Sequence, residues 1–299
     1  MSDPVGNLLE LLDIERLEHD LFRGQSPDER ANQRVFGGQV IAQALVAAQR
    51  TVSDDRTCHS LHAYFIRPGD PKVPIIYQVD HARDGGSFTT RRVVAIQHGK
   101  QIFNLAASFQ VPEDSWEHQH DMPDVPPPEA LKGLRERRVE IAEKVPEALR
   151  HEFTRERDMP QVPPPEALKG LRERRIEIAD NVPEKLRHEF TRERDIEMRD
   201  VTPLDLFHPE PASDVHQVWF RVAREVGDDP ALHLCLLAYA SDMSLLGTGN
   251  RPHGLTWFDP KLMSASLDHA IWFHAPVKFS DWHLYAMDSP FAGSGRSFN

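Results

Sequence analysis

The feature that most constrains the fold is a long stretch of alternating apolar and polar residues between Ser60 and Val111. A period of two turns one face of each strand toward a core, so it predicts an antiparallel meander with strands at residues 60–68, 75–82, 87–97 and 101–111. Such a sheet needs a cover for its apolar face. Residues 36–52, FGGQVIAQALVAAQRTV, have little polar surface and predict a buried helix that covers it. Residues 8–21 predict a further, amphipathic helix.

The same order recurs in the second half of the chain. Val218, Phe220 and Val222 alternate in a strand, residues 232–246 are apolar, and residues 266–276 and 283–289 predict two more strands. SLHAYFIRP at 60–68 is similar to SLDHAIWFHAP at 266–276. We therefore expect an α+β fold with two helix-on-antiparallel-sheet units, residues 1–112 and 212–299. GGSFTT continues into two full strands in the first unit, whereas AGSGRSFN ends the sequence, so we expect the second unit to lack its last strands and to leave a sheet edge open.

Residues 113–211 differ from both units because they are rich in charge and proline. They contain a tandem duplication, residues 122–158 and 159–195, whose two copies are nearly identical. A solenoid needs about three or more repeats with a shared apolar face, and these copies do not provide it. We interpret the segment as a duplicated connector in which each copy forms a proline-started helix, a break at Val145-Pro146 or Val182-Pro183, and a short second helix.

Charge and composition exclude several classes of function. The chain of 299 residues has a formal net charge of −12, which argues against a nucleic-acid partner and an anionic membrane surface. No apolar run approaches ~18 residues, so we expect no membrane span. The N-terminus is acidic and does not resemble a signal peptide, which favours a cytoplasmic protein. Cys58 and Cys235 do not have the spacing of a zinc site or a redox pair, and we expect neither a metal nor a cofactor.

One carboxylate stands out in the apolar segment AYASDMSLLG, residues 238–247. Burying an unpaired carboxylate is costly, so Asp242 is expected to be either hydrogen-bonded for structure or poised for chemistry. The residues alone do not decide between these two roles.

Several motifs together suggest a family. LFRGQS, VFGGQVIAQAL, YFIRPGD, RDGGSF, AYASDM and DHAIWFH resemble, in this order, the acyl-CoA thioesterase II (TesB-type) family. The resemblance covers nearly the whole chain outside the duplicated connector. It implies a double-hotdog fold, hydrolysis of fatty acyl-CoA to fatty acid and free CoA, no cofactor, and association into a homo-oligomer.

The resemblance also implies a catalytic set of Asp, Ser or Thr, and Gln that orients and activates a water. The Asp maps onto Asp242 and the hydroxyl residue onto Ser266, while the strand that carries the Gln has no counterpart before Asn299. Alternatively, Asp242 braces the helix and Ser266 bonds to backbone. A catalytically weak acyl-CoA-binding protein is the alternative function. A hotdog hydratase would need an Asp–His pair, and no such motif is present.

Five further residues are candidates for substrate binding: Gly38, Arg67, Arg91, Asp268 and His269. The guanidinium groups suit the phosphates of CoA, although exposed solvated arginine is the simpler interpretation. Gly38 could present a backbone N–H to the thioester, but it lies in the first unit, and we expect it far from Asp242. Asp268 shares a strand face with Ser266 and is either a second carboxylate of the site or structural. His269 is either a site residue or a core histidine.

Overall fold

The structure, a computed structural model of the chain, describes residues 3–26, 34–113, 163, 165–177, 193–256, 259 and 262–299. Residues 1–112 and 164–299 form one compact unit, and residues 113–163 form a second. The helices and strands described below belong to the first of these units. The first connector copy, residues 122–158, lies outside the described residues.

The larger sheet has the strand order β1-β2-β4-β5-β6-β3-β9, and each neighbouring pair is antiparallel. Its strands are β1 (Glu15–Glu18), β2 (Leu21–Gly24), β3 (Thr57–Phe65), β4 (Ile75–Asp84), β5 (Phe88–Gln97), β6 (Lys100–Gln110) and β9 (Asp268–Trp272). The four strands predicted from the alternation are confirmed as β3 to β6. His98 and Gly99, with φ of 50° and 67°, make the tight turn between β5 and β6.

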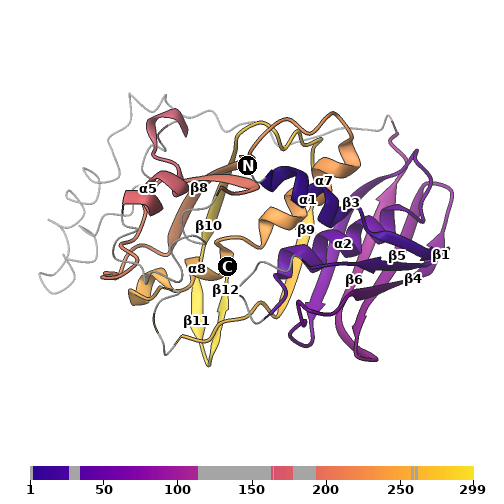
Figure 1. Cartoon of the computed structure of the whole chain (residues 1–299), viewed down its shortest axis with the longest axis horizontal. Coiled ribbons are helices and arrows are strands. Elements are labelled where there is room, and N and C mark those ends of the chain that lie inside the picture. Colours follow the sequence, from indigo (N-terminus) through magenta and orange to yellow (C-terminus); the bar gives the residue numbers. More distant parts are fainter. Residues whose placement is uncertain are drawn as a thin grey trace, which may run out of the picture. The chain divides into compact units, whose positions relative to one another are not determined.

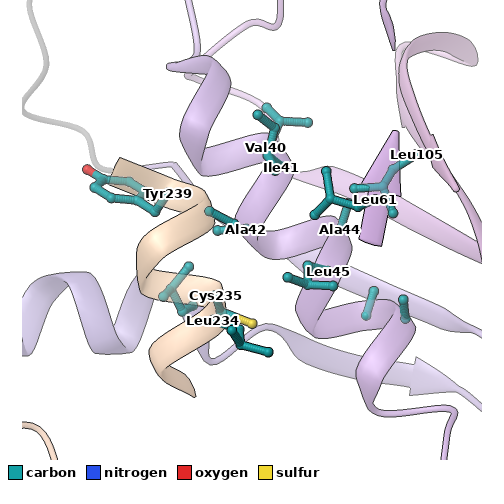
Figure 2. Packing of buried hydrophobic residues seen from close by; sticks show 14 of the residues in the cluster. Val40, Ile41, Ala42, Ala44, Leu45, Leu61, Leu105, Leu234, Cys235 and Tyr239 are labelled. Carbon is teal, nitrogen blue, oxygen red and sulfur yellow. The ribbon is translucent and has the colours of Figure 1, made fainter. Parts of the chain in front are cut away.

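Helix α2 (Gly37–Gln49) covers the apolar face of this sheet, as predicted (Figure 1). Its residues are buried on nearly every side because α7 (Pro230–Ser241) packs on the face that the sheet does not cover. Figure 2 shows Leu61 and Leu105 of the sheet on one side of α2, and Cys235 and Tyr239 of α7 on the other. The two helices are antiparallel, since Tyr239 lies beside the beginning of α2.

The predicted helix at residues 8–21 is wrong beyond Leu12. Helix α1 (Pro4–Leu12) starts at an Asp3 cap and buries Val5, Leu8 and Leu12 against the core. Residues 15–18 and 21–24 instead form the β1–β2 hairpin, which extends the sheet beside β4. The leucines that suggested one helical face therefore lie on three different elements, α1, β1 and β2.

The second half forms a smaller sheet with the order β10-β8-β7. Its strands are β7 (Ile196–Asp200), β8 (Val215–Val222) and β10 (His283–Asp288), and a separate hairpin follows in β11 (Phe291–Gly293) and β12 (Arg296–Phe298). The predicted strand at 266–276 forms β9, but it pairs with β3 and so joins the sheet of the first half.

One strand lies within the expected limits of the connector. β7 lies at residues 196–200, inside the range 113–211, yet it pairs with β8 and is an edge strand of the second sheet. The described part of the second connector copy forms the short helix η3 (Pro165–Ala167) and α5 (Leu171–Glu177), which contacts β7. α8 (Leu245–Thr248) and η5 (Arg251–His253) follow α7.

One helical stretch among the described residues, Pro230–His253, is long and apolar enough to cross a membrane by length and composition, with a mean hydropathy of 1.2. No such stretch was expected from the sequence. It is weak evidence for a span, because a core helix of a soluble protein meets the same criterion, and its α7 portion packs against α2.

Candidate active site

Asp242 lies directly after the last turn of α7, where it caps the C-terminal end of the helix. It stands in the wall of a cavity of about 1170 Å³, together with Gly37 and Ser266. Much of the remaining wall is apolar and comes from both halves of the chain, including Phe65, Ile102, Phe103, Met198, Leu246 and Leu262. A cavity of this size, with a few polar groups in an apolar wall, is typical of a small-molecule site.

One group from each half of the chain holds the Asp242 carboxylate. The Gly38 N–H donates to Oδ2 at 3.0 Å, and the Ser266 hydroxyl donates to Oδ1 at 3.0 Å. Gly38 belongs to the first turn of α2, so the carboxylate also faces the positive end of a helix dipole. Burial raises the pKa of Asp242 from 3.8 to about 6, although the two hydrogen bonds oppose this rise. Such a carboxylate is mostly ionised at neutral pH and basic enough to accept a proton.

Two glycines allow α2 and α7 to approach this closely. A Cβ on Gly38 would lie 2.1 Å from the carbonyl oxygen of Tyr239, and a Cβ on Gly37 would lie 2.5 Å from Oδ2 of Asp242. The expectation that Gly38 is far from Asp242 is wrong, because the beginning of α2 meets the end of α7. The contact joins residues 204 positions apart, and no local pattern announces it.

Ser241, the residue before Asp242, is fixed by two strands. The Tyr285 hydroxyl on β10 donates to the Ser241 carbonyl at 2.7 Å, and Ser241 Oγ donates to the Ala238 carbonyl at 2.9 Å. His269 Nε2 on β9 lies 2.9 Å from the same Oγ. Because the serine proton is directed at Ala238, the imidazole is the donor here. Burial lowers the pKa of His269, which favours its neutral form.

His269 was predicted as a possible binding residue, and the structure places it behind the site. It does not line the cavity, and its hydrogen bond to Ser241 supports the end of the helix that carries Asp242. Asp268 does not line the cavity either. It lies at the beginning of β9, where its side chain is exposed.

The two predicted arginines have different environments. Arg67 lines the cavity, and its Nη1 donates to the carbonyl oxygen of Gln101 at 2.5 Å. Arg91 is buried away from the cavity, where its guanidinium donates to Thr51 Oγ1 at 2.9 Å and to Asp84 Oδ1 at 2.6 Å. The structure therefore brings Arg67 and Ser266 to the cavity that contains Asp242, and it places the Gly38 N–H against the Asp242 carboxylate. It does not bring Arg91 to the cavity.

Three arginines that were not predicted as site residues line the same cavity, Arg34, Arg175 and Arg194. Arg175 and Arg194 belong to the second connector copy, which was interpreted as a spacer. The density of arginine in that copy was the available signal, but its charge also suits a solvated surface, and the sequence does not show which residues face inward.

The chemistry of the described residues centres on this carboxylate. No group of three or more His, Cys, Asp or Glu side chains in the described ranges is placed to hold a metal ion. Burial raises the pKa of the Cys58 thiol to about 12 and also raises that of Cys235, so neither is a ready nucleophile. Asp242, with a hydroxyl and a helix N-terminus beside it, can orient a water and take its proton.

Comparisons with known proteins agree on one family. Residues 185–299 match the family model described as acyl-CoA thioesterase, and residues 26–110 match the acyl-CoA thioesterase N-terminal domain. Acyl-coenzyme A thioesterase 8 of Homo sapiens is 38% identical over 302 residues, covering 99% of this chain and 84% of the relative. Acyl-CoA thioesterase 2 of Haemophilus influenzae is 38% identical over 296 residues, covering 99% of this chain and 90% of the relative.

Solved structures show the same likeness. The acyl-CoA thioesterase II TesB2 of Mycobacterium marinum is 35% identical, with a TM-score of 0.64, and the alignment covers 97% of this chain and 87% of that one. A tesB protein of Mycobacterium avium subsp. paratuberculosis is 27% identical, with a TM-score of 0.66 and coverage of 97% and 88%. The double-hotdog arrangement expected from the sequence is therefore confirmed.

Proposed function

Because the chain belongs to the acyl-CoA thioesterase family, we propose that it hydrolyses fatty acyl-CoA to fatty acid and free CoA, with Asp242 as the base that activates the water. The observation that carries this proposal is the pairing of the Asp242 carboxylate with Gly38 N–H and Ser266 Oγ in the wall of a large cavity.

In the proposed reaction, a water held by Asp242 and Ser266 attacks the carbonyl carbon of the thioester. Its proton passes to Asp242, and a tetrahedral intermediate forms with negative charge on the former carbonyl oxygen. The carbon–sulfur bond then breaks, and the proton on Asp242 passes to the departing sulfur to give the CoA thiol. The fatty acid loses its proton to solvent. A thioester carbonyl is electrophilic enough that no covalent enzyme intermediate is required.

The surroundings of Asp242 support this role for physical reasons. Burial disfavours the charged form of the Asp242 carboxyl and therefore raises its pKa. The hydrogen bonds from Gly38 and Ser266 offset part of that effect, and the α2 N-terminus favours negative charge. The result is an ionised base whose pKa of about 6 lies close to neutral pH.

The test is the rate of CoA thiol release from a medium- or long-chain acyl-CoA. Asp242→Asn should lower kcat by ~10²–10⁴-fold, the usual loss when a general base is removed. Asp288→Asn makes the same substitution at an exposed position of β10 and should leave kcat unchanged. An Asp242→Asn variant that retains more than half of kcat would show that Asp242 is structural. An unaltered chain that binds acyl-CoA without releasing thiol would favour the binding-protein alternative, which family membership does not support.

We also propose that the chain forms a homo-oligomer in the cytoplasm. The outer face of β3 and β9 supports the association, because Tyr64 and Trp272 lie on it with 61% and 57% of their surface exposed. Sedimentation of the purified chain tests the first part of this proposal, and cell fractionation tests the second.

A further inference from the structure

The cavity around Asp242 differs in charge from the rest of the chain. Among the described residues, four arginines line it, Arg34, Arg67, Arg175 and Arg194, against two carboxylates, Asp195 and Asp242. The chain as a whole carries a formal charge of −12. A local excess of guanidinium groups in an acidic protein indicates a site for an anionic ligand, because it focuses positive potential where the surrounding surface would repel the ligand.

We propose that these four arginines form the subsite for the phosphate groups of CoA, and that the second copy of the duplicated segment is therefore part of the substrate site. This inference rests on the proposed function. CoA carries a diphosphate and a ribose phosphate on the far side of its pantetheine arm from the thioester. Guanidinium groups can bind phosphate oxygens through two parallel hydrogen bonds, which a flexible ammonium cannot reproduce.

Two arginines come from the first half of the chain. Arg34 precedes Val35, whose N–H donates to the Gly69 carbonyl at 2.9 Å, and the Arg67 N–H donates to the Ile102 carbonyl at 3.0 Å. These backbone bonds hold the two segments beside each other in one part of the cavity wall.

The other two arginines come from the second connector copy, and the structure anchors both. Arg194 adjoins Asp195, whose Oδ2 accepts the Tyr239 hydroxyl at 3.0 Å and whose carbonyl accepts the Ala223 N–H at 2.9 Å. Arg175 lies on α5, which is tied to β7 by an ion pair of 3.9 Å between Arg174 and Asp200. Because α5 contacts β7, which is paired with β8 in the second sheet, this part of the copy is held in the cavity wall.

The duplication is consistent with a binding role. The first copy carries an identical Arg at each corresponding position, Arg138 for Arg175 and Arg157 for Arg194. That copy lies outside the described residues. Both copies therefore carry the arginines that line the cavity in the second.

The experiment compares two thioesters of the same acyl chain, one on CoA and one on pantetheine, which lacks the phosphates. Arg175→Gln combined with Arg194→Gln should lower kcat/KM for the CoA thioester by roughly tenfold to a hundredfold, from two lost charged contacts. KM should carry most of that loss, and the pantetheine thioester should be hydrolysed as before. A second variant also replaces Arg138 and Arg157 by Gln, so that the first copy cannot substitute for the second.

The matched control is Arg172→Gln combined with Arg224→Gln. It removes the same charge from side chains that are each 51% exposed and do not line the cavity, so its kcat/KM for both thioesters should stay unchanged. The proposal is overturned if neither arginine variant changes the ratio of the two kcat/KM values, or if the control changes it equally.

Binding of free CoA, measured by calorimetry, separates this proposal from the proposed function. If the unaltered chain hydrolyses neither thioester, the catalytic proposal has failed, and the CoA affinity of the variants still decides the subsite. A fall in affinity of roughly tenfold or more supports the arginine subsite, and an unchanged affinity overturns it.

Discussion

Replacing Asp242 by Asn should stabilise the fold while it removes the activity. Asn has nearly the same shape, and its Oδ1 can still accept the Gly38 N–H while its amide donates to Ser266 Oγ. The substitution therefore preserves both contacts of the side chain and removes the buried charge. If Asp242 only stabilised the end of α7, Asp242→Asn would instead destabilise the fold, because the hydrogen bonds to a charged acceptor would be lost.

The magnitude follows from the pKa of Asp242. It is raised from 3.8 to about 6, and ~1.36 kcal/mol per pKa unit gives about 3 kcal/mol as the upper limit of the destabilisation caused by the ionised group. For a raised pKa, the stability that protonation contributes is complete below pH 3.8 and is lost as the pH rises through about 6. Asp242 partly faces the cavity, so we expect a gain of roughly 1–2 kcal/mol for Asp242→Asn at pH 7.5.

Urea unfolding at two pH values measures this effect. The gain in unfolding free energy should be largest at pH 7.5, and at pH 4.5 it should fall to about a third of that value, because the folded carboxyl is then protonated. Asp288→Asn, on the exposed side of β10, should change the unfolding free energy by less than about 0.5 kcal/mol at either pH. The reasoning is refuted if Asp242→Asn loses stability at pH 7.5.

Two further predictions concern the partners of Asp242. Ser266→Ala removes a hydrogen bond that lowers the pKa of Asp242. The acid limb of the plot of kcat/KM against pH should therefore move upward from about 6, and kcat should fall. An acid limb that stays in place would show that Ser266 does not influence the base. Gly38→Ala places a Cβ 2.1 Å from the Tyr239 carbonyl, so it should lower the unfolding free energy despite the ~1 kcal/mol higher helix propensity of Ala. The control is Gly86→Ala, because a Cβ built on Gly86 would have no atom within 4 Å. An equal change in unfolding free energy for the two variants would contradict the close contact between Gly38 and Tyr239.

The parts of the fold that could be predicted from the sequence are those with a local signal. The alternation of apolar and polar residues along β3 to β6 predicted the strands, because a few neighbouring residues are enough to show which positions are buried. The segment of α2 is apolar on nearly every side, which predicted a buried helix but not the element that covers the face turned away from the sheet. That element is α7, from the other half of the chain.

The parts that could not be predicted depend on contacts between distant residues. β9 has the strand pattern expected of it, but nothing in residues 268–272 shows that its partner is β3. The contact between Gly38 and Asp242 also joins distant residues, so no local pattern predicts it. The same holds for the position of Arg175 and Arg194 in the cavity wall. The identity of Asp242 and Ser266 as candidate residues came from family resemblance, and the structure added their mutual geometry.

The antiparallel packing of α2 and α7 creates two equivalent positions, of which one carries the proposed catalytic carboxylate. At one end, the cap of α7 is Asp242, and it faces the N-terminus of α2. At the other end, the residue in the same position is Arg50, the cap of α2, and it forms an ion pair of 2.5 Å with Asp13. A guanidinium cannot act as a base, and this one is engaged in holding the segment after α1. The two halves share a fold, yet the substitution of one capping residue confines the proposed chemistry to a single site, which needs α2 from the first half and Asp242 from the second.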